Sequence, residues 1–344
     1  MDRVLGKPQS RLQRARIDFA LQPMMRKEHD MISQWLSRFC GLMLGVVLLA
    51  GEAHAEEKIY IVTSLPDLAD IAARIGGDLV TVESLAKGIE DPHGVPIKPS
   101  FVPKLNRAQV LIVMGLEYEH SWIPALVTES RNSKIVKGNS GYIDVSLKVT
   151  PKEVPTDLSR AKGELHPAGN PHFNLDPEGG RLIAQTIAEG LTLNFPQHRA
   201  TFEANLKVFL AQLNAKIRDW EILARPLHGV KFISYHQDFT YFADRFGMDY
   251  VGTIELKPGI EPTASHLVEL MQNMKTVGAK IVLREPHFSE KVPNQIAAQV
   301  GGLVVKLPIM VGGSPEVKTY FDLIEYNIRE LLKAAQVAGV AGKV

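Results

Sequence analysis

Histidine is the residue type in this chain whose placement most suggests chemistry. Nine of the 11 histidines follow Ala55, and three of those nine lie in turn-rich loops or directly after an apolar run. His93 lies in GIEDPHGVPIKPS, His172 lies in HPAGNPHFNLDP, and His236 follows KFISY. A neutral imidazole in such a loop offers the nitrogen lone pair that zinc and related metals bind. These three are therefore candidate metal ligands, although a single loop histidine more often only hydrogen-bonds or faces solvent.

The elements that must position these loops alternate between short apolar strands and amphipathic helices. A pattern without glycine between Gln197 and Leu227, with apolar residues at helical spacing, predicts one long helix. Together these patterns predict an α/β fold of two lobes, each with a mainly parallel sheet flanked by helices, joined by that helix. The predicted strands are IYIVTS (59–64), VLIVMG (110–115), SKIVKG (133–138), KFISY (231–235), YVGTIEL (250–256), KIVLRE (280–285) and LVVKL (303–307).

The N-terminus has the order of a secretory signal. Basic residues precede the charge-free run FCGLMLGVVLLA at 39–50, and the small-x-small triplet Ala53-His54-Ala55 follows it. This order predicts a leader over 1–55 that is removed after Ala55, and hence a periplasmic protein. The alternative is a membrane anchor, but the run is shorter than the roughly 20 residues that a span needs. The only cysteine, Cys40, precedes the run, so it is badly placed for lipid attachment.

Several phrases of the sequence resemble one known family. DPHGVPIKPS, GNPHFNLDP and SYHQDFTYFADRFG are similar to the three metal-ligand motifs of the zinc/manganese solute-binding proteins of ABC importers. IELKPGIEPTASHL and YFDLIEYNIRELL also resemble that family, and the similarity covers residues 58–335. The resemblance implies two α/β lobes joined by one long helix, with His93 and His172 as ligands from the first lobe and His236 from the second. It also implies metal capture in the periplasm and delivery to a membrane permease. The corresponding segments are 56–195, 196–227 and 228–344.

The metal expected at this site is zinc, with manganese as the alternative. In the resembling family, histidine at the third ligand position goes with zinc and a carboxylate goes with manganese, and imidazole nitrogen suits zinc chemically. The sequence does not decide the identity of the fourth ligand. Glu285 is the predicted residue, and Asp91, Glu90, His166 or a water molecule are the alternatives. Asp176, directly before Pro177, is expected to cap a helix.

The remaining features limit the function classes. Three histidines with an open position also describe a catalytic zinc, so a zinc hydrolase is an alternative. However, neither HExxH nor GxSxG occurs in the sequence, and we expect no enzymatic activity. Basic and acidic residues number 39 and 38, without a basic block, which excludes an evident nucleic-acid surface. The expected protein is a monomer whose partners are a metal ion and an ABC permease, with His120 and His287 as auxiliary or ordinary surface histidines.

Overall fold

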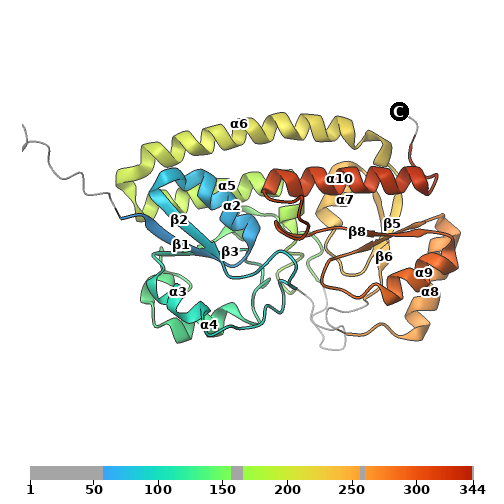
Figure 1. Cartoon of the computed structure of the whole chain (residues 1–344), viewed down its shortest axis with the longest axis horizontal. Coiled ribbons are helices and arrows are strands. Elements are labelled where there is room, and N and C mark those ends of the chain that lie inside the picture. Colours follow the sequence, from blue (N-terminus) through green and yellow to red (C-terminus); the bar gives the residue numbers. More distant parts are fainter. Residues whose placement is uncertain (1–56, 156–165, 256–259, 343–344) are drawn as a thin grey trace, which may run out of the picture. The chain divides into compact units, whose positions relative to one another are not determined.

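The computed structural model describes residues 57–155, 166–255 and 260–342. The leader predicted over 1–55 lies outside these residues. Residues 57–344 form one compact unit, in which two α/β lobes are bridged by one long helix (Figure 1). The fold class predicted from the sequence is confirmed. In the part of the chain that the structure describes, no helix is both long enough and apolar enough to cross a membrane.

The first lobe is built on four parallel strands in the order β2-β1-β3-β4. The two central strands are almost wholly buried, as expected for a parallel sheet with helices on both faces. Figure 1 shows α2 and α5 on one face and α3 and α4 on the other. The elements of this lobe are β1 (Ile59–Thr63), α2 (Pro66–Gly76), β2 (Val80–Ser84), α3 (Phe101–Arg107), β3 (Val110–Val113), α4 (Ile123–Ser130), β4 (Tyr142–Asp144) and α5 (Pro177–Asn194).

One strand of this sheet differs from the sequence prediction. The run at 133–138 was expected to be a strand, but Ser133–Ile135 is a short 3₁₀ turn. The Asn132 side chain accepts a hydrogen bond from the Lys134 N–H, which turns the chain at the start of the run. The fourth strand comes later, at Tyr142–Asp144. The prediction was wrong because two apolar residues were read as a strand while the capping side chain before them was overlooked.

The second lobe repeats the parallel arrangement, with its strands in the order β6-β5-β7-β8. Because all neighbours in each sheet are parallel, the loops that follow the strands meet at one edge of that sheet. The loops after β5, β6 and β7 carry polar residues that are used below. The elements are β5 (Lys231–Ser234), α7 (Thr240–Phe246), β6 (Asp249–Thr253), α8 (Ala264–Val277), β7 (Ile281–Arg284), α9 (Lys291–Val300), β8 (Leu303–Lys306) and α10 (Tyr320–Val337).

The long helix α6 runs from Arg199 to Leu223. At 1.5 Å per residue its 25 residues span about 37 Å, enough to run alongside both lobes. Figure 1 shows α6 and α10 side by side, and the rings of Phe209 and Phe321 stack with 5.3 Å between their centroids. The buried residues of α6 lie on one face of the helix: Phe202, Phe209, Leu213, Ile217 and Trp220. The sequence limits of 196–227 contain this helix together with a short 3₁₀ turn at each end.

Buried polar contacts tie the second half of the chain to the first. The Arg245 guanidinium contacts the Asp176 carboxylate with 2.7 Å between Nε and Oδ1, and Asp176 also caps α5 as predicted. The Tyr320 hydroxyl donates to the Asn174 carbonyl at 2.8 Å, while the Asn174 amide donates to the Ile309 carbonyl at 3.0 Å. The two buried hydrogen bonds and the partly buried ion pair give a junction of defined geometry.

Asp67 is a further buried group at this junction. Its Oδ1 accepts the Val311 N–H at 3.1 Å, while its Oδ2 has no hydrogen-bond partner among the described residues. Burial raises the pKa of Asp67 to about 7, mainly because the charged form loses its hydration. A carboxyl group whose folded pKa is raised stabilises the fold below its unfolded pKa of about 4 and loses that contribution as the pH rises through about 7.

We therefore expect Asp67→Asn to gain stability relative to the wild type as the pH rises from 5 to 8. The gain should be a few kcal/mol, with about 4 kcal/mol as the ceiling set by a pKa change from about 4 to about 7. Urea unfolding of the metal-free protein at both pH values measures it, and any pH-independent cost of burying the amide cancels in the difference. Asp70→Asn is the control, since Asp70 pairs with Arg74 at a partly exposed position. An equal offset of the Asp67 variant at both pH values would contradict the expectation.

Candidate metal centre

His172 lies immediately before the turn that leads into α5. The Asn170 amide donates to Glu153 Oε2 and to the Gln237 carbonyl, so the Asn170 oxygen must face His172. That oxygen accepts the His172 backbone N–H at 2.9 Å and lies 2.8 Å from Nδ1 of the ring. The hydrogen of the neutral ring is therefore on Nδ1, and Nε2 carries a free lone pair. Asn170 thus prepares His172 to bind a metal through Nε2.

His236 is prepared in the same way by a carboxylate. It follows strand β5, and its Nδ1 lies 2.9 Å from Oε2 of Glu255, which follows the neighbouring strand β6. A carboxylate accepts hydrogen bonds, so Nδ1 carries the hydrogen and Nε2 is the free nitrogen. This Nε2 is buried and has no partner among the described residues. A buried polar atom without a partner is costly unless something else binds there, which points to a cation.

His93 is held by its loop between β2 and α3. Its backbone N–H donates to Asp91 Oδ1 at 2.9 Å, and its carbonyl accepts the Ser121 hydroxyl. The Trp122 indole N–H donates to the adjacent Pro92 carbonyl at 3.0 Å. The His93 ring is directed at His172, and their Nε2 atoms are 3.1 Å apart. Two nitrogens that bind one zinc ion at about 2.0–2.1 Å lie about 3 to 3.5 Å apart, so this spacing suits a shared ion.

A fourth histidine completes the group. His93, His166, His172 and His236 each offer one nitrogen, and these four nitrogens all lie within 4.8 Å of one another. The His166 ring stacks on that of His93 with 4.8 Å between centroids, and its Nε2 has no described partner. Tyr118 closes one side, with its ring edge-on to His93 at 4.5 Å. The arrangement can hold one metal ion by nitrogen ligands from both lobes.

The local electrostatics keep most of these rings neutral. Burial, together with the neighbouring histidines, lowers the pKa of His93 well below its usual value and that of His166 to about 3. Burial also lowers the pKa of His172, although Asp238 opposes it. His236 differs: burial alone lowers its pKa, but the carboxylates of Asp238 and Glu255 outweigh burial and raise it. Neutral imidazole is the form that binds metal, so three rings are ready near neutral pH.

Comparison with known proteins identifies the family. The family described as "Zinc-uptake complex component A periplasmic" (ZnuA) matches residues 61–334 of this chain. The chain belongs to this family. Among curated proteins, the high-affinity zinc uptake system protein ZnuA of Brucella abortus is 25% identical over 337 residues, which cover 89% of this chain and 97% of that protein.

Other relatives agree with this membership. The zinc-binding lipoprotein AdcA of Streptococcus pneumoniae is 24% identical, and the match covers 90% of this chain but only 62% of AdcA, less than two thirds of its length. A crystal structure of ZnuA superposes with a TM-score of 0.68 at 28% identity, covering 81% of this chain and 99% of that one. A zinc-bound ZnuA deletion mutant gives a TM-score of 0.69 at 28% identity, covering 84% of this chain and 100% of that one.

Within this zinc-uptake family member, the structure brings three of the four predicted ligands together and leaves Glu285 outside the group. Glu285 follows β7 and is fully buried, and its Oε1 accepts the His236 backbone N–H at 3.4 Å. Burial and the adjacent Asp238 raise its pKa well above the usual value. A raised pKa makes a carboxyl group a weaker metal ligand, because metal must displace its proton, and this group is also directed at a backbone N–H. Ligation by Glu285 remains a prediction that this arrangement does not favour.

The fourth nitrogen of the group belongs to His166, which the sequence offered as an alternative to Glu285. The sequence feature that favours His166 as a candidate ligand is its position six residues before His172, in the same proline- and glycine-containing loop, HPAGNPH. The other two histidines considered lie outside the group. His120 is exposed, with Nδ1 2.8 Å from the Glu117 carbonyl, and the His287 ring lies tilted against that of Phe288 with 4.3 Å between centroids.

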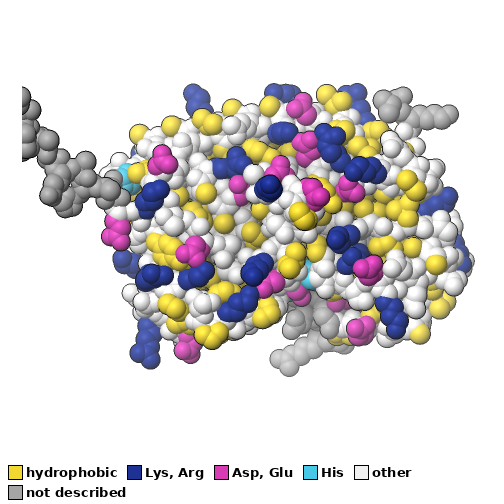
Figure 2. All heavy atoms as spheres, in the orientation of Figure 1, with side chains coloured by type: hydrophobic (Ala, Val, Ile, Leu, Met, Phe, Trp, Pro, Cys, Tyr) yellow, Lys and Arg dark blue, Asp and Glu magenta, His cyan; other side chains and the backbone are white. Residues whose placement is uncertain are grey.

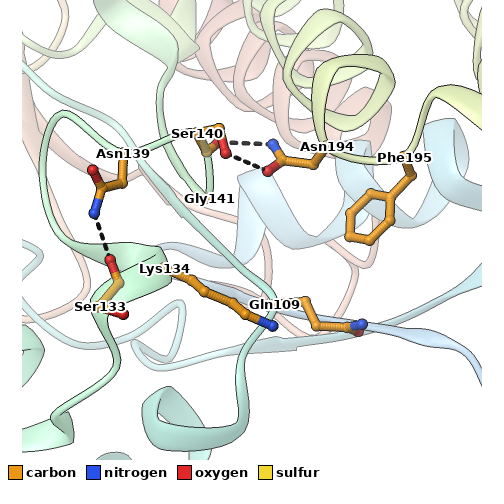
Figure 3. Close-up of a pocket in the computed structure, with 8 residues that line it drawn as sticks. All are labelled: Gln109, Ser133, Lys134, Asn139, Ser140, Gly141, Asn194 and Phe195. Carbon is orange, nitrogen blue, oxygen red and sulfur yellow. Dashed lines mark hydrogen bonds between the residues drawn. The ribbon is translucent and has the colours of Figure 1, made fainter.

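The surface outside the metal centre offers no comparable site in the residues that Figures 2 and 3 show. On the face drawn in Figure 2, basic and acidic side chains are interspersed, without a large area of one sign. Figure 3 shows a pocket of about 460 Å³ in which Asn139 pairs with Ser133, and Asn194 with Ser140. Gln109 and Gly141 place it at the amino ends of β3 and β4, the edge opposite to the one where parallel sheets bind ligands.

Proposed function

We propose that this protein captures one zinc ion in the periplasm and delivers it to an ABC-type membrane permease. The observation that carries the proposal is the group of four histidine nitrogens within 4.8 Å of one another, of which those of His166 and His236 have no other described partner. Relatives named for zinc uptake and zinc binding support it. The proposed ligands are His93, His166, His172 and His236, with His166 in place of Glu285.

The donor set favours zinc over manganese. Imidazole nitrogens suit zinc, whereas manganese prefers carboxylate and water oxygens. Four nitrogens also match the tetrahedral coordination that zinc adopts in closed protein sites. A hydrolase would need an open coordination position and a carboxylate base, and a fourth histidine fills that position.

The leader over 1–55 is part of the proposal. Export through this segment and cleavage after Ala55 would place residues 56–344 in the periplasm, the compartment in the family description. We also propose that loading moves the lobes only slightly. The contacts between Asp176 and Arg245 and between Tyr320 and Asn174 hold the junction, and α6 packs along both halves.

Metal content tests the proposal. The full chain is expressed in a host that exports it, recovered from the periplasmic fraction, and dialysed against equal concentrations of zinc, manganese, iron and cobalt. We expect one zinc per chain and, by mass spectrometry, an N-terminus at Glu56. Manganese in place of zinc would overturn the metal assignment but keep the transport role. No retained metal would refute the proposed function, and recovery of an unprocessed chain would refute the leader.

A further inference from the structure

Asp238 is a buried carboxylate at the metal centre that is not among the four proposed ligands. It lies in the loop between β5 and α7, two residues after His236, and it is 1% exposed. Its Oδ1 is 2.7 Å from Nε2 of His172, the nitrogen that Asn170 leaves free to bind metal. Neither Asp238 oxygen receives a hydrogen bond of regular geometry from the described residues.

The facing atoms of Asp238 and His172 require a positive charge. With the hydrogen of the neutral His172 ring on Nδ1, a lone pair of Nε2 and a carboxylate oxygen point at each other, and two acceptors repel unless a proton or a cation joins them. No lysine or arginine of the described residues forms an ion pair with Asp238. A buried carboxylate costs several kcal/mol, as an order of magnitude, unless it is paired. The partners of Asp238 are the His172 ring and the carboxyl group of Glu285, and neither carries a permanent positive charge.

The spacing allows one ion to join both groups. Nε2 of His172 is 3.1 Å from Nε2 of His93 and 2.7 Å from Oδ1 of Asp238. Ligand atoms around one zinc ion at about 2.0–2.2 Å are roughly 3 Å apart or slightly more, so the contact between Asp238 and His172 must widen by a few tenths of an ångström. The Asp238 carboxylate is not among the atoms that all lie within 4.8 Å of one another, so it must also turn toward the other nitrogens when the ion binds. Glu285 also lies beside this group, but its Oε1 accepts the His236 backbone N–H at 3.4 Å and it is outside the set of mutually close ligand atoms.

We propose that Asp238 is a further ligand, an anionic oxygen that binds the metal beside the histidines. This inference rests on the proposed function and narrows the range of metal ions that the site should bind. Four imidazoles alone form a neutral site, whereas the carboxylate adds one negative charge in a buried setting. That charge favours a divalent ion over a monovalent one, since attraction to the ion grows with the ion's charge. The site then has five ligand atoms, within the range that zinc reaches when coordination expands.

Asp238→Asn tests this role while keeping the shape of the side chain. We expect zinc affinity, measured by competition with a chromophoric chelator, to fall by at least about 100-fold, the upper end of the loss seen for outer partners of a ligand. With Co²⁺ in place of zinc, we expect the visible absorption to become stronger, because removing the oxygen takes the ion from five ligands toward a tetrahedral four. Glu285→Gln is the matched control, since it makes the same carboxyl-to-amide change in the adjacent side chain, which lies outside the group of ligands. It should retain the wild-type cobalt spectrum.

The outcomes separate the inference from the proposed function. Wild-type affinity in Asp238→Asn, or a weaker site with the wild-type cobalt spectrum, would overturn ligation and leave Asp238 as a group that only positions His172. Failure of the wild-type protein to bind zinc would refute the proposed function itself. If the variant does not fold, the zinc-loaded wild-type crystal structure decides. An Asp238 oxygen within about 2.2 Å of the ion supports the proposal, and one beyond about 3 Å refutes it.

Discussion

Replacing His172 by alanine should lower the zinc affinity of this protein by at least about 1,000-fold. A metal ligand contributes more than the 10–100-fold that its outer hydrogen-bond partners contribute. His172 should show this effect most clearly because its Nε2 faces both His93 and Asp238, and because Asn170 holds its ring in place. Isothermal titration of the metal-free variant in competition with a chelator measures the loss.

His120→Ala is the control for this substitution. His120 is an exposed histidine of the same lobe that lies outside the group of four nitrogens, so its loss should change the zinc affinity less than about threefold, within the range of surface substitutions. Thermal unfolding of both metal-free variants checks that neither has lost the fold. Retention of one tightly held zinc by His172→Ala would show that the metal binds elsewhere.

Removing zinc should lower the thermal stability by a large and pH-dependent amount. At a free zinc concentration of 1,000 times Kd, binding adds about 4 kcal/mol to the free energy of unfolding. At roughly 1.5 to 2 °C per kcal/mol for a chain of this size, the melting temperature should rise by about 6 to 8 °C. Differential scanning calorimetry with and without a chelator measures this difference.

The pH dependence of zinc affinity follows from the pKa directions at the site. A raised pKa keeps a proton on His236 at a pH where a free imidazole has lost it, so zinc must displace that proton. The affinity then falls about tenfold for each unit that the pH decreases below this pKa. The pKa values of His93, His166 and His172 are lowered, so these rings have no proton to lose near neutral pH.

Between about pH 5 and 6.5, the logarithm of zinc affinity should therefore change with pH with a slope near one. Four ordinary histidines would give a slope near four in the same range. Zinc titrations in buffers of different ionisation enthalpy count the protons released and measure this slope. A slope near four would show that the rings are solvated in the metal-free protein, and a flat profile would show that His236 also has no proton to lose in this range.

Features of the site and fold could be predicted from the sequence where they depend only on the order of residues along the chain. His236 directly follows an apolar run, and parallel strands end at one edge, so its place near the strand ends could be predicted. Asp176 before Pro177 predicted the cap of α5, which the structure shows. The sequence analysis missed strand β2, VTVES, because it mixes polar and apolar residues and so lacks a continuous apolar run. Such a strand is possible because β2 lies at the edge of the sheet, where its side chains are less buried than those of the central strands.

The directions of the side chains could not be predicted from the order of residues in the chain. Glu285 follows β7 at the same edge as His236, so its position suited a ligand, but its carboxyl group is directed at a backbone N–H. His166 lies in the first lobe near His172, yet only the folded loop shows its ring stacked on His93. The orientation of Asn170, which decides the tautomer of His172, depends on two acceptors from distant parts of the chain.

The four histidines are divided unequally between the two halves of the chain. His93, His166 and His172 precede α6, and His236 alone follows it. An ion bound as proposed that lost its bond to His236 would still be held by three nitrogens, so its departure would proceed in steps and not in one release. Moving the second half away would remove His236 and, with it, the proposed ligand Asp238, and would leave the ion on the three nitrogens of the first half. Handover would then be a series of ligand exchanges, and its slowest steps would be those at the three histidines that precede α6.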